Sequence, residues 1–284
     1  GVGRFQQSLP KRLVVEQPRE TRQRLEVRAL GGLRHDEGEE EVGGKPIEAL
    51  KVHARLTAAH AGDDAVDGVT LAVGHVERYN AIVENAKTCI DNGDWGQILT
   101  LSAKRFSNYP SRIHDVGVLF DLTIHDVDII SYLSSGNVRK VYASGGMAKN
   151  KLHEDYINLI IEFDEGHIGL CETNWLTPMK VRELNITTTK CYVNLNYLTQ
   201  EIKILSSQFG KIDESNLYQP SINVNEKKVS LKGTEPLKSE LVDFLESVRG
   251  KKSPLVTGED GLKAIEIVEA GLRSIKQAHK QKLR

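Results

Sequence analysis

The chain has 284 residues, of which 39% are hydrophobic and 27% charged, and its formal net charge is -1. This balance is typical of a soluble protein with one large domain or two, and it argues against nucleic-acid or anionic-membrane partners. The three cysteines, Cys89, Cys171 and Cys191, are widely spaced and odd in number, which favours a reducing compartment over a disulfide framework. Because the sequence has neither a membrane-length apolar run nor a signal-peptide core, we expect a cytoplasmic protein.

The N-terminal region differs in composition from the rest of the chain. Arginine is the main cation up to about residue 44, and lysine takes over later. Leu13–Val15 predicts one short strand, but no complete βαβ unit follows. Gly1–Gln6 has the first two glycines of a dinucleotide fingerprint, but Gln6 stands where the third small residue belongs. This segment is therefore a weak nucleotide signal.

These features predict two parts of unequal character. We expect the division near residue 74, between residues 1–74 and residues 75–284. One hypothesis for the composition break is that residues 1 to about 44, or as far as 67, derive from a shifted reading frame, a truncated gene model or a fusion.

The chain then alternates predicted helices and strands. Pro46 can open a helix from about Ile47 to Ala61, and Val69–Val73 reads as a buried strand. Such a strand, ending in glycine and then polar residues, is where open α/β sheets place ligands. Arg78 follows it, and its guanidinium fits a phosphate or a carboxylate. A solvated surface arginine is the competing interpretation.

The helical pattern from Asp115 to Leu133 contains the main candidate site. Asp121 and His125 are four residues apart, so they stand on one face of a helix. A carboxylate beside an imidazole suits a general base that works near neutral pH. The competing interpretation is a polar stripe with a structural histidine. In the preceding loop, Tyr109 and Arg112 are residue types that bind sugar hydroxyls and phosphates. The competing interpretation is that both are surface side chains without a ligand.

The remaining pattern predicts a largely antiparallel sheet followed by two helices. Short turns separate the strands, and a glycine turn at 164–166 joins one hairpin. The expected elements are a helix at 81–92 capped by Asn80, strands at 98–106, 138–144, 156–163, 167–174, 181–187, 192–197, 202–205 and 227–231, and helices at 235–249 and 259–280.

A metal site is a further interpretation that the residue types leave open. Carboxylates and imidazoles are hard or borderline ligands. No spacing among them fixes a ligand set, so we assign no metal ligand. The residues concerned are His114, Asp115, His125, Asp126, Asp128, His153 and Asp155.

Several motifs together resemble the Gfo/Idh/MocA family of NAD(P)-dependent sugar oxidoreductases. Residues 174–178 and Lys180-Val-Arg182 are similar to its UDP-N-acetylglucosamine 3-dehydrogenase branch. The resemblance covers roughly residues 69–284. Its other motifs are Lys45-Pro46-Ile47, Val69–Val73, Gly74–Asn80, Tyr109–Arg112, Asp115–Gly117 and Asp121–Asp128.

The resemblance implies an α/β protein with an α+β C-terminal part. Residues 1–74 would be an atypical, incomplete dinucleotide-binding region, the remnant of a Rossmann-like domain. Residues 75–284 would be the substrate and oligomerisation domain, an open, mostly antiparallel sheet with helices packed on one face. NAD or NADP would be the cofactor, a sugar or sugar nucleotide the substrate, and the sheet would form a homodimer or homotetramer. The family's lysine of a Glu-Lys-Pro motif falls on Lys45, although Gly44 replaces the glutamate, and the family's proline after Asn80 is Ala81.

The resemblance also implies roles for individual residues. His125 would be the catalytic base, Asp121 would hold its tautomer, and Lys45 would stabilise the developing oxyanion. Lys45, Pro46 and Arg78 would lie beside the cofactor, and Tyr109, Arg112 and His125 beside the sugar nucleotide. The implied reaction is oxidation of a sugar, at C3 of a UDP-N-acetylhexosamine. The alternative is a non-catalytic binding or oligomerisation module with a lost or misread cofactor domain.

Overall fold

The computed structural model describes residues 12–16, 26–29, 70–111, 113, 115–209 and 222–278. The helix expected at 47–61 lies outside these residues. Two compact units divide the chain, one made of residues 1–76 and 237–265 and the other of residues 77–236 and 266–284.

In the first unit, the described strands form a three-stranded sheet of order β2-β1-β3. The strands are β1 (Arg12–Glu16), β2 (Glu26–Ala29) and β3 (Thr70–Val73), and β1 pairs antiparallel with both neighbours. The predicted strands at 13–15 and 69–73 are therefore confirmed. A doubly wound dinucleotide-binding sheet uses parallel strands, so these pairs do not supply that arrangement.

Two helices complete the described part of this unit, α4 (Pro236–Val248) and the start of α5 (Gly258–Ala278). Phe244 and Val248 of α4 pack against Ala72 of β3. Asp243 accepts a hydrogen bond from the backbone N–H of Leu255 at 2.9 Å, which holds the turn between the helices.

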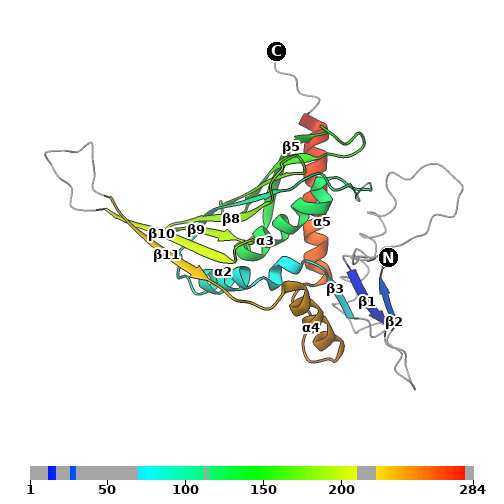
Figure 1. Ribbon diagram of the computed structural model, residues 1–284, viewed down its shortest axis with the longest axis horizontal. Coiled ribbons are helices and arrows are strands. Elements are labelled where there is room, and N and C mark those ends of the chain that lie inside the picture. Colours follow the sequence, from blue (N-terminus) through cyan, green and yellow to red (C-terminus); the bar gives the residue numbers. More distant parts are fainter. Residues whose placement is uncertain are drawn as a thin grey trace, which may run out of the picture. The chain divides into compact units, whose positions relative to one another are not determined.

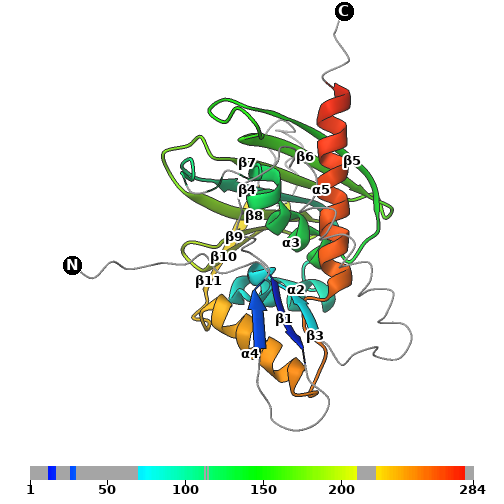
Figure 2. The ribbon, with the colours of Figure 1, turned by 90° about the vertical axis from the view of Figure 1, so that its right-hand side faces the viewer.

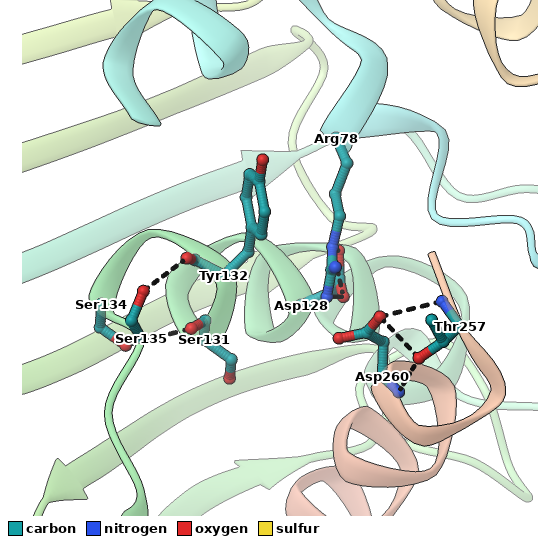
Figure 3. Close-up of polar contacts among 8 residues, drawn as sticks. All are labelled: Arg78, Asp128, Ser131, Tyr132, Ser134, Ser135, Thr257 and Asp260. Carbon is teal, nitrogen blue, oxygen red and sulfur yellow. Dashed lines mark hydrogen bonds and ion pairs between the residues drawn. The ribbon is translucent and has the colours of Figure 1, made fainter. Parts of the chain in front are cut away.

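The helix α5 begins with a reciprocal cap. The hydroxyl of Thr257 accepts from the backbone N–H of Asp260 at 3.3 Å, and the Asp260 carboxylate accepts from the N–H of Thr257 at 2.9 Å (Figure 3). Two backbone donors at the helix start are thereby satisfied.

The second unit is built on an eight-stranded sheet of order β11-β10-β9-β8-β4-β7-β6-β5. All of its neighbouring pairs are antiparallel except β4–β7, which is parallel. The strands are β4 (Ile98–Phe106), β5 (Val138–Gly146), β6 (Tyr156–Phe163), β7 (Ile168–Asn174), β8 (Val181–Thr188), β9 (Tyr192–Asn196), β10 (Glu201–Phe209) and β11 (Ile222–Ser230).

Helices cover one face of this sheet. The helices α2 (Ala81–Asp91) and α3 (Ile124–Ser134) and the second half of α5 lie on the same side (Figures 1 and 2). Alternate strand residues such as Leu101, Leu159 and Leu184 are buried beneath them, as period-two alternation requires. The mostly antiparallel open sheet with helices on one face is therefore confirmed.

One end of the sheet gathers the connections that matter for the site. The register aligns Phe106 with Asn174 and Val181, and Asn174 with Tyr156. The loops after β4 and β7 and the loop before β6 therefore meet at the same end. This end also receives the start of the helix that contains Asp121 and His125.

The expected helix over 115–133 is only partly correct. Residues 115–117 are not helical, and a π-helical turn, η2 (Leu119–Thr123), precedes α3. The Thr123 hydroxyl donates to the carbonyl of Val118, five residues back, at 3.4 Å. A side chain that takes up a backbone carbonyl in this way competes with the ordinary helical bond.

No helix in the described part of the chain is long and apolar enough to cross a membrane.

Glu240 of α4 gives the first unit a pH-dependent stability. Its Oε2 is buried without a hydrogen-bond partner among the described residues, and burial, with Asp243 nearby, raises the pKa of Glu240 to about 7. The unfolded chain loses this proton near pH 4.5, so stability falls as the pH rises from about 4.5 to 7. Because the side chain is partly exposed, we expect a loss of about 1–2 kcal/mol.

Glu240→Gln removes this titration. We expect the variant to melt at a higher temperature than the wild type at pH 8 and at a similar temperature at pH 4. Glu235→Gln, at an exposed position just before α4, is the control. Equal wild-type and Glu240→Gln melting temperatures at pH 8 would contradict the prediction.

Candidate functional site

The helix start that bears Asp121 is held by Glu154, which precedes β6. The Glu154 carbonyl accepts from the N–H of Val118 at 2.9 Å, and its carboxylate accepts from the N–H of Leu119 at 3.2 Å. Two of the N–H groups that a helix leaves unsatisfied at its start are thus paired, and the negative charge lies at the positive end of the helix dipole.

Gly117 makes this approach possible. A Cβ atom at this position would lie 2.1 Å from the Glu154 carboxylate, which no real contact permits. A larger residue would displace the Glu154 side chain from the N–H of Leu119. The glycine and the glutamate therefore act together in fixing where the helix begins.

The loop that presents Glu154 is itself anchored by a buried aspartate. The Asp155 carboxylate accepts from the backbone N–H groups of Ala148, Lys149 and Asn150 at 2.7–3.1 Å, and its side chain is inaccessible to solvent. Three backbone donors around one carboxylate form a stable anion nest. The connection between β5 and β6 is thereby held in one conformation.

A buried ion network fixes α3 against the sheet. Arg105 of β4 donates through Nε to both carboxylate oxygens of Asp126 at 2.9 and 3.0 Å, and its Nη1 lies 3.0 Å from Oε1 of Glu77. Asn80 donates to the other Glu77 oxygen at 3.3 Å. Glu77, Arg105 and Asp126 are all buried, and a bidentate guanidinium–carboxylate pair is both strong and directional.

A second buried pair holds α3 from another side. Arg78, in the short helix η1 (Val76–Tyr79), donates to Asp128 through Nε at 3.0 Å and through Nη2 at 2.7 Å (Figure 3). The Arg78 guanidinium also stacks over the Tyr132 ring, 4.6 Å from its centre. Arg78 is only 5% exposed, so its interpretation as a solvated surface arginine is wrong.

Asp121 and His125 lie on consecutive turns of η2 and α3, and both side chains are partly buried. Residues advance by about 100° each on an α-helix, so His125 lies between the directions of Asp126 and Asp128. The two ion pairs therefore set the rotation of the helix that presents His125. A half-buried imidazole on a fixed helix, one turn from a carboxylate, can act as a proton acceptor.

The loop after β4 brings Tyr109 to the same end of the sheet. The Tyr109 ring meets Trp175 edge-on at 5.9 Å between centres, and Asn108 donates to the carbonyl of Pro178 at 3.3 Å. The loops after β4 and β7 thus support each other. Three other predicted site residues, Lys45, Pro46 and Arg112, lie outside the described residues.

Three of the four aspartates considered as metal ligands have other partners. Asp126 and Asp128 each bind an arginine, and Asp155 binds backbone N–H groups. Where the structure describes the chain, no three histidine, cysteine or acidic residues gather as a metal site.

The described residues do not form a dinucleotide cradle. The strands of the first unit pair antiparallel, and the Arg78 guanidinium is engaged by Asp128 and Tyr132. Arg78 therefore has a structural role in this geometry, and its role beside a cofactor stays a prediction.

Sequence reasoning missed the residues that hold the helix. Arg105 stands at an inward position of β4, after Leu101 and Ala103, and an inward charge on an apolar strand face signals a buried partner. No sequence pattern points to Glu154 in the same way, because it lies 35 residues from its partner Leu119.

Removing one member of the buried pair should destabilise the protein strongly. We expect Asp128→Ala to lower the free energy of unfolding by about 3–5 kcal/mol, because Arg78 is left buried without its carboxylate. Asp91→Ala is the matched control, since Asp91 pairs with Lys87 at the surface and such pairs contribute only about 0.3–0.5 kcal/mol. Urea unfolding of both variants measures the difference, and equal losses would contradict the assignment.

Comparison with known proteins shows what this part of the chain is similar to. Residues 83–194 match the model of the GFO/IDH/MocA C-terminal domain. A scyllo-inositol 2-dehydrogenase (NAD(+)) of Bacillus subtilis is 28% identical over 220 residues, which are 74% of this chain and 61% of that protein. A UDP-N-acetylglucosamine 3-dehydrogenase of Acidithiobacillus ferrooxidans is 22% identical over 198 residues, which are 69% of this chain and 59% of that protein.

Solved structures agree in fold. The UDP-N-acetylglucosamine 3-dehydrogenase GnnA of Acidithiobacillus ferrooxidans superposes with a TM-score of 0.68 at 19% identity, covering 81% of this chain and 69% of that one. The WlbA dehydrogenase of Bordetella pertussis, in complex with NADH and UDP-GlcNAcA, gives 0.54 at 20% identity, covering 71% and 60%. The two curated relatives are matched over only about three fifths of their length. Residues 83–194 therefore match the C-terminal domain of the GFO/IDH/MocA family, and the relatives named above share less than 30% identity with the chain.

Proposed function

We propose that this chain is an NAD(P)-dependent oxidoreductase that acts on a sugar or sugar nucleotide, with oxidation at C3 of a UDP-N-acetylhexosamine as its specific reaction. The observation that carries the proposal is the family's C-terminal domain with Asp121 and His125 on a helix that buried ion pairs hold in place. Relatives named as inositol and UDP-N-acetylglucosamine dehydrogenases support the substrate class.

In this proposal, His125 accepts the proton of the sugar hydroxyl that is oxidised. Asp121 orients the imidazole and stabilises its protonated form, and Lys45 stabilises charge that develops on the sugar oxygen. Tyr109 and Arg112 bind the sugar or its nucleotide. The ion pairs of Asp126 and Asp128 keep the helix from rotating, so the imidazole needs no rearrangement before it reacts.

The nicotinamide cofactor, when bound, accepts the hydride from the sugar carbon. WlbA and a levoglucosan dehydrogenase are described in complexes with NADH, which supports the choice of cofactor. Lys45, Pro46 and Arg78 are the residues that we assign to the cofactor side of the site.

His125→Ala should abolish turnover while the protein keeps its melting temperature. Reduction of NAD+ or NADP+ is followed by absorbance with a panel of inositols, sugars and UDP-N-acetylhexosamines, and cofactor binding by NADH fluorescence. His167→Gln is the matched control, because this histidine stacks on Phe163 in the β6–β7 hairpin. Its activity should stay near that of the wild type.

A near wild-type rate for His125→Ala would remove the proposed base. A chain that neither binds NADH nor oxidises any sugar of the panel would instead favour the non-catalytic binding or oligomerisation module.

The sheet face opposite the helices is our proposed oligomer interface. It exposes apolar side chains in neighbouring strands: Tyr142 is directly opposite Ile160, and Ile168 follows on the next strand. Exposed apolar patches of this kind mark protein–protein interfaces.

We expect light scattering to give a dimer or tetramer, and Ile160→Lys to lower the mass to that of the monomer. Tyr192→Lys, on a strand far along the sheet, tests how far the interface extends, and a monomeric wild-type protein would contradict the proposal.

A further inference from the structure

Two cations at the start of β8, Lys180 and Arg182, stand at the same end of the sheet as Asp121 and His125. Arg182 is directly opposite Arg105 in the β4–β8 pair. Like charges in directly opposed positions of a sheet are unfavourable unless something else compensates them. The surroundings of Arg182 therefore need an explanation.

The carboxylates nearby are already engaged by Arg105. Arg105 takes both oxygens of Asp126 at 2.9 and 3.0 Å and Oε1 of Glu77 at 3.0 Å. Arg182 reaches the same Glu77 oxygen only at 3.7 Å, and its side chain is 31% exposed. Part of its guanidinium thus faces solvent, and Glu77 does not accept from all of its N–H donors.

Lys180 adds a second uncompensated charge beside Arg182. Arg182 is the main cause that lowers the pKa of Lys180, and burial contributes. For Arg182 itself, burial lowers the pKa most, followed by Arg105. Within the described chain, no carboxylate lies at ion-pair distance from Lys180. Glu77, Asp126 and Asp121 offset part of this charge, but Arg105 already engages Glu77 and Asp126.

The loop that ends at Lys180 is held in one arrangement. The side chain of Asn174 accepts from the N–H of Leu176 at 2.9 Å, and the Thr177 hydroxyl donates to the carbonyl of Met179 at 3.0 Å. Asn108 ties Pro178 to the loop that carries Tyr109. A cation pair on an ordered loop has less conformational entropy to lose on binding than two mobile surface side chains.

The position of the pair links it to the proposed reaction. The charge of Asp121 contributes to the electrostatic environment of Arg182, so the cations lie within electrostatic range of the proposed reacting groups. A neutral polyol would leave the repulsion between the cations unrelieved. An anionic group on the substrate would relieve it, and a guanidinium with an ammonium suits a phosphate or a carboxylate.

We propose that Lys180 and Arg182 bind an anionic group of the sugar substrate, so that this chain selects a nucleotide sugar or a sugar acid over a neutral cyclitol such as inositol. The inference rests on the proposed function in that it takes the anion to be part of the sugar substrate. Binding of the anion itself can be measured without the reaction. The two possible anions, a diphosphate and a carboxylate, share the same recognition chemistry and are separated by the experiment.

Calorimetric titration of the full chain with UDP, glucuronate and N-acetylglucosamine tests the proposal without hydride transfer. We expect UDP or glucuronate to bind, and Lys180→Gln and Arg182→Gln each to weaken that binding by roughly ten- to a hundredfold, as expected when a charged hydrogen bond is lost. Arg182→Lys should retain part of the affinity. UDP binding alone identifies a diphosphate, and glucuronate binding alone a carboxylate.

Lys104→Gln is the matched control. Lys104 lies next to Arg105 on β4 but is half exposed, with Glu172 as its partner at 3.9 Å. We expect its affinities to equal those of the wild type. If Arg182→Gln melts early because Glu77 loses a neighbour, the exposed Lys180 still gives the answer.

The inference is overturned if neither anion binds the wild type more tightly than it binds Lys180→Gln. That result, with sugar oxidation retained, would remove the anion site and leave the proposed function. Anion binding that depends on Lys180 in a chain that oxidises no sugar would uphold the site and remove the proposed reaction.

Discussion

The second unit depends on one arginine in the middle of its sheet. Arg105 is buried and binds Asp126 of α3 and Glu77 of η1, so a single guanidinium joins a strand, a helix and a short helical turn. Burying such charges costs several kcal/mol per ion, and only near-ideal geometry offsets that cost. We therefore interpret the network as fixing one arrangement of the strand, the helix and the helical turn, and not as a source of net stability. Its counterpart, Arg78 with Asp128, fixes the same helix from a second direction.

These constraints act on the helix that carries the proposed reacting groups. Its start is set by Glu154 through Gly117, and its rotation is set by the two buried carboxylates. Asp121 and His125 are thus presented by a rigid element rather than by a loop. Proton transfer requires the acceptor within hydrogen-bond reach of the reacting group, so a fixed helix is a suitable support.

Many elements of the second unit could be predicted from the sequence, although β10 and β11 are longer than expected. Alternation gave the boundaries of β4 and β6 correctly, and Asn80 marked the start of α2. The parallel pairing of β4 with β7 could not be predicted, because local patterns do not tell which distant strands meet. The same holds for the ion pairs, since Arg78 and Asp128 are 50 residues apart. A polar stripe on a helix shows that partners exist, but only the fold identifies them.

The central claim is that ligand binds beside His125 at the end of the sheet. Histidine-labelled protein can be titrated with UDP-N-acetylglucosamine and followed by NMR, with the His125 signal assigned by its loss in His125→Ala. The account predicts that the His125 signal shifts as the ligand binds and that the signal of His167, in the distant hairpin, does not. Calorimetric binding of the sugar nucleotide with an unchanged His125 signal would contradict it.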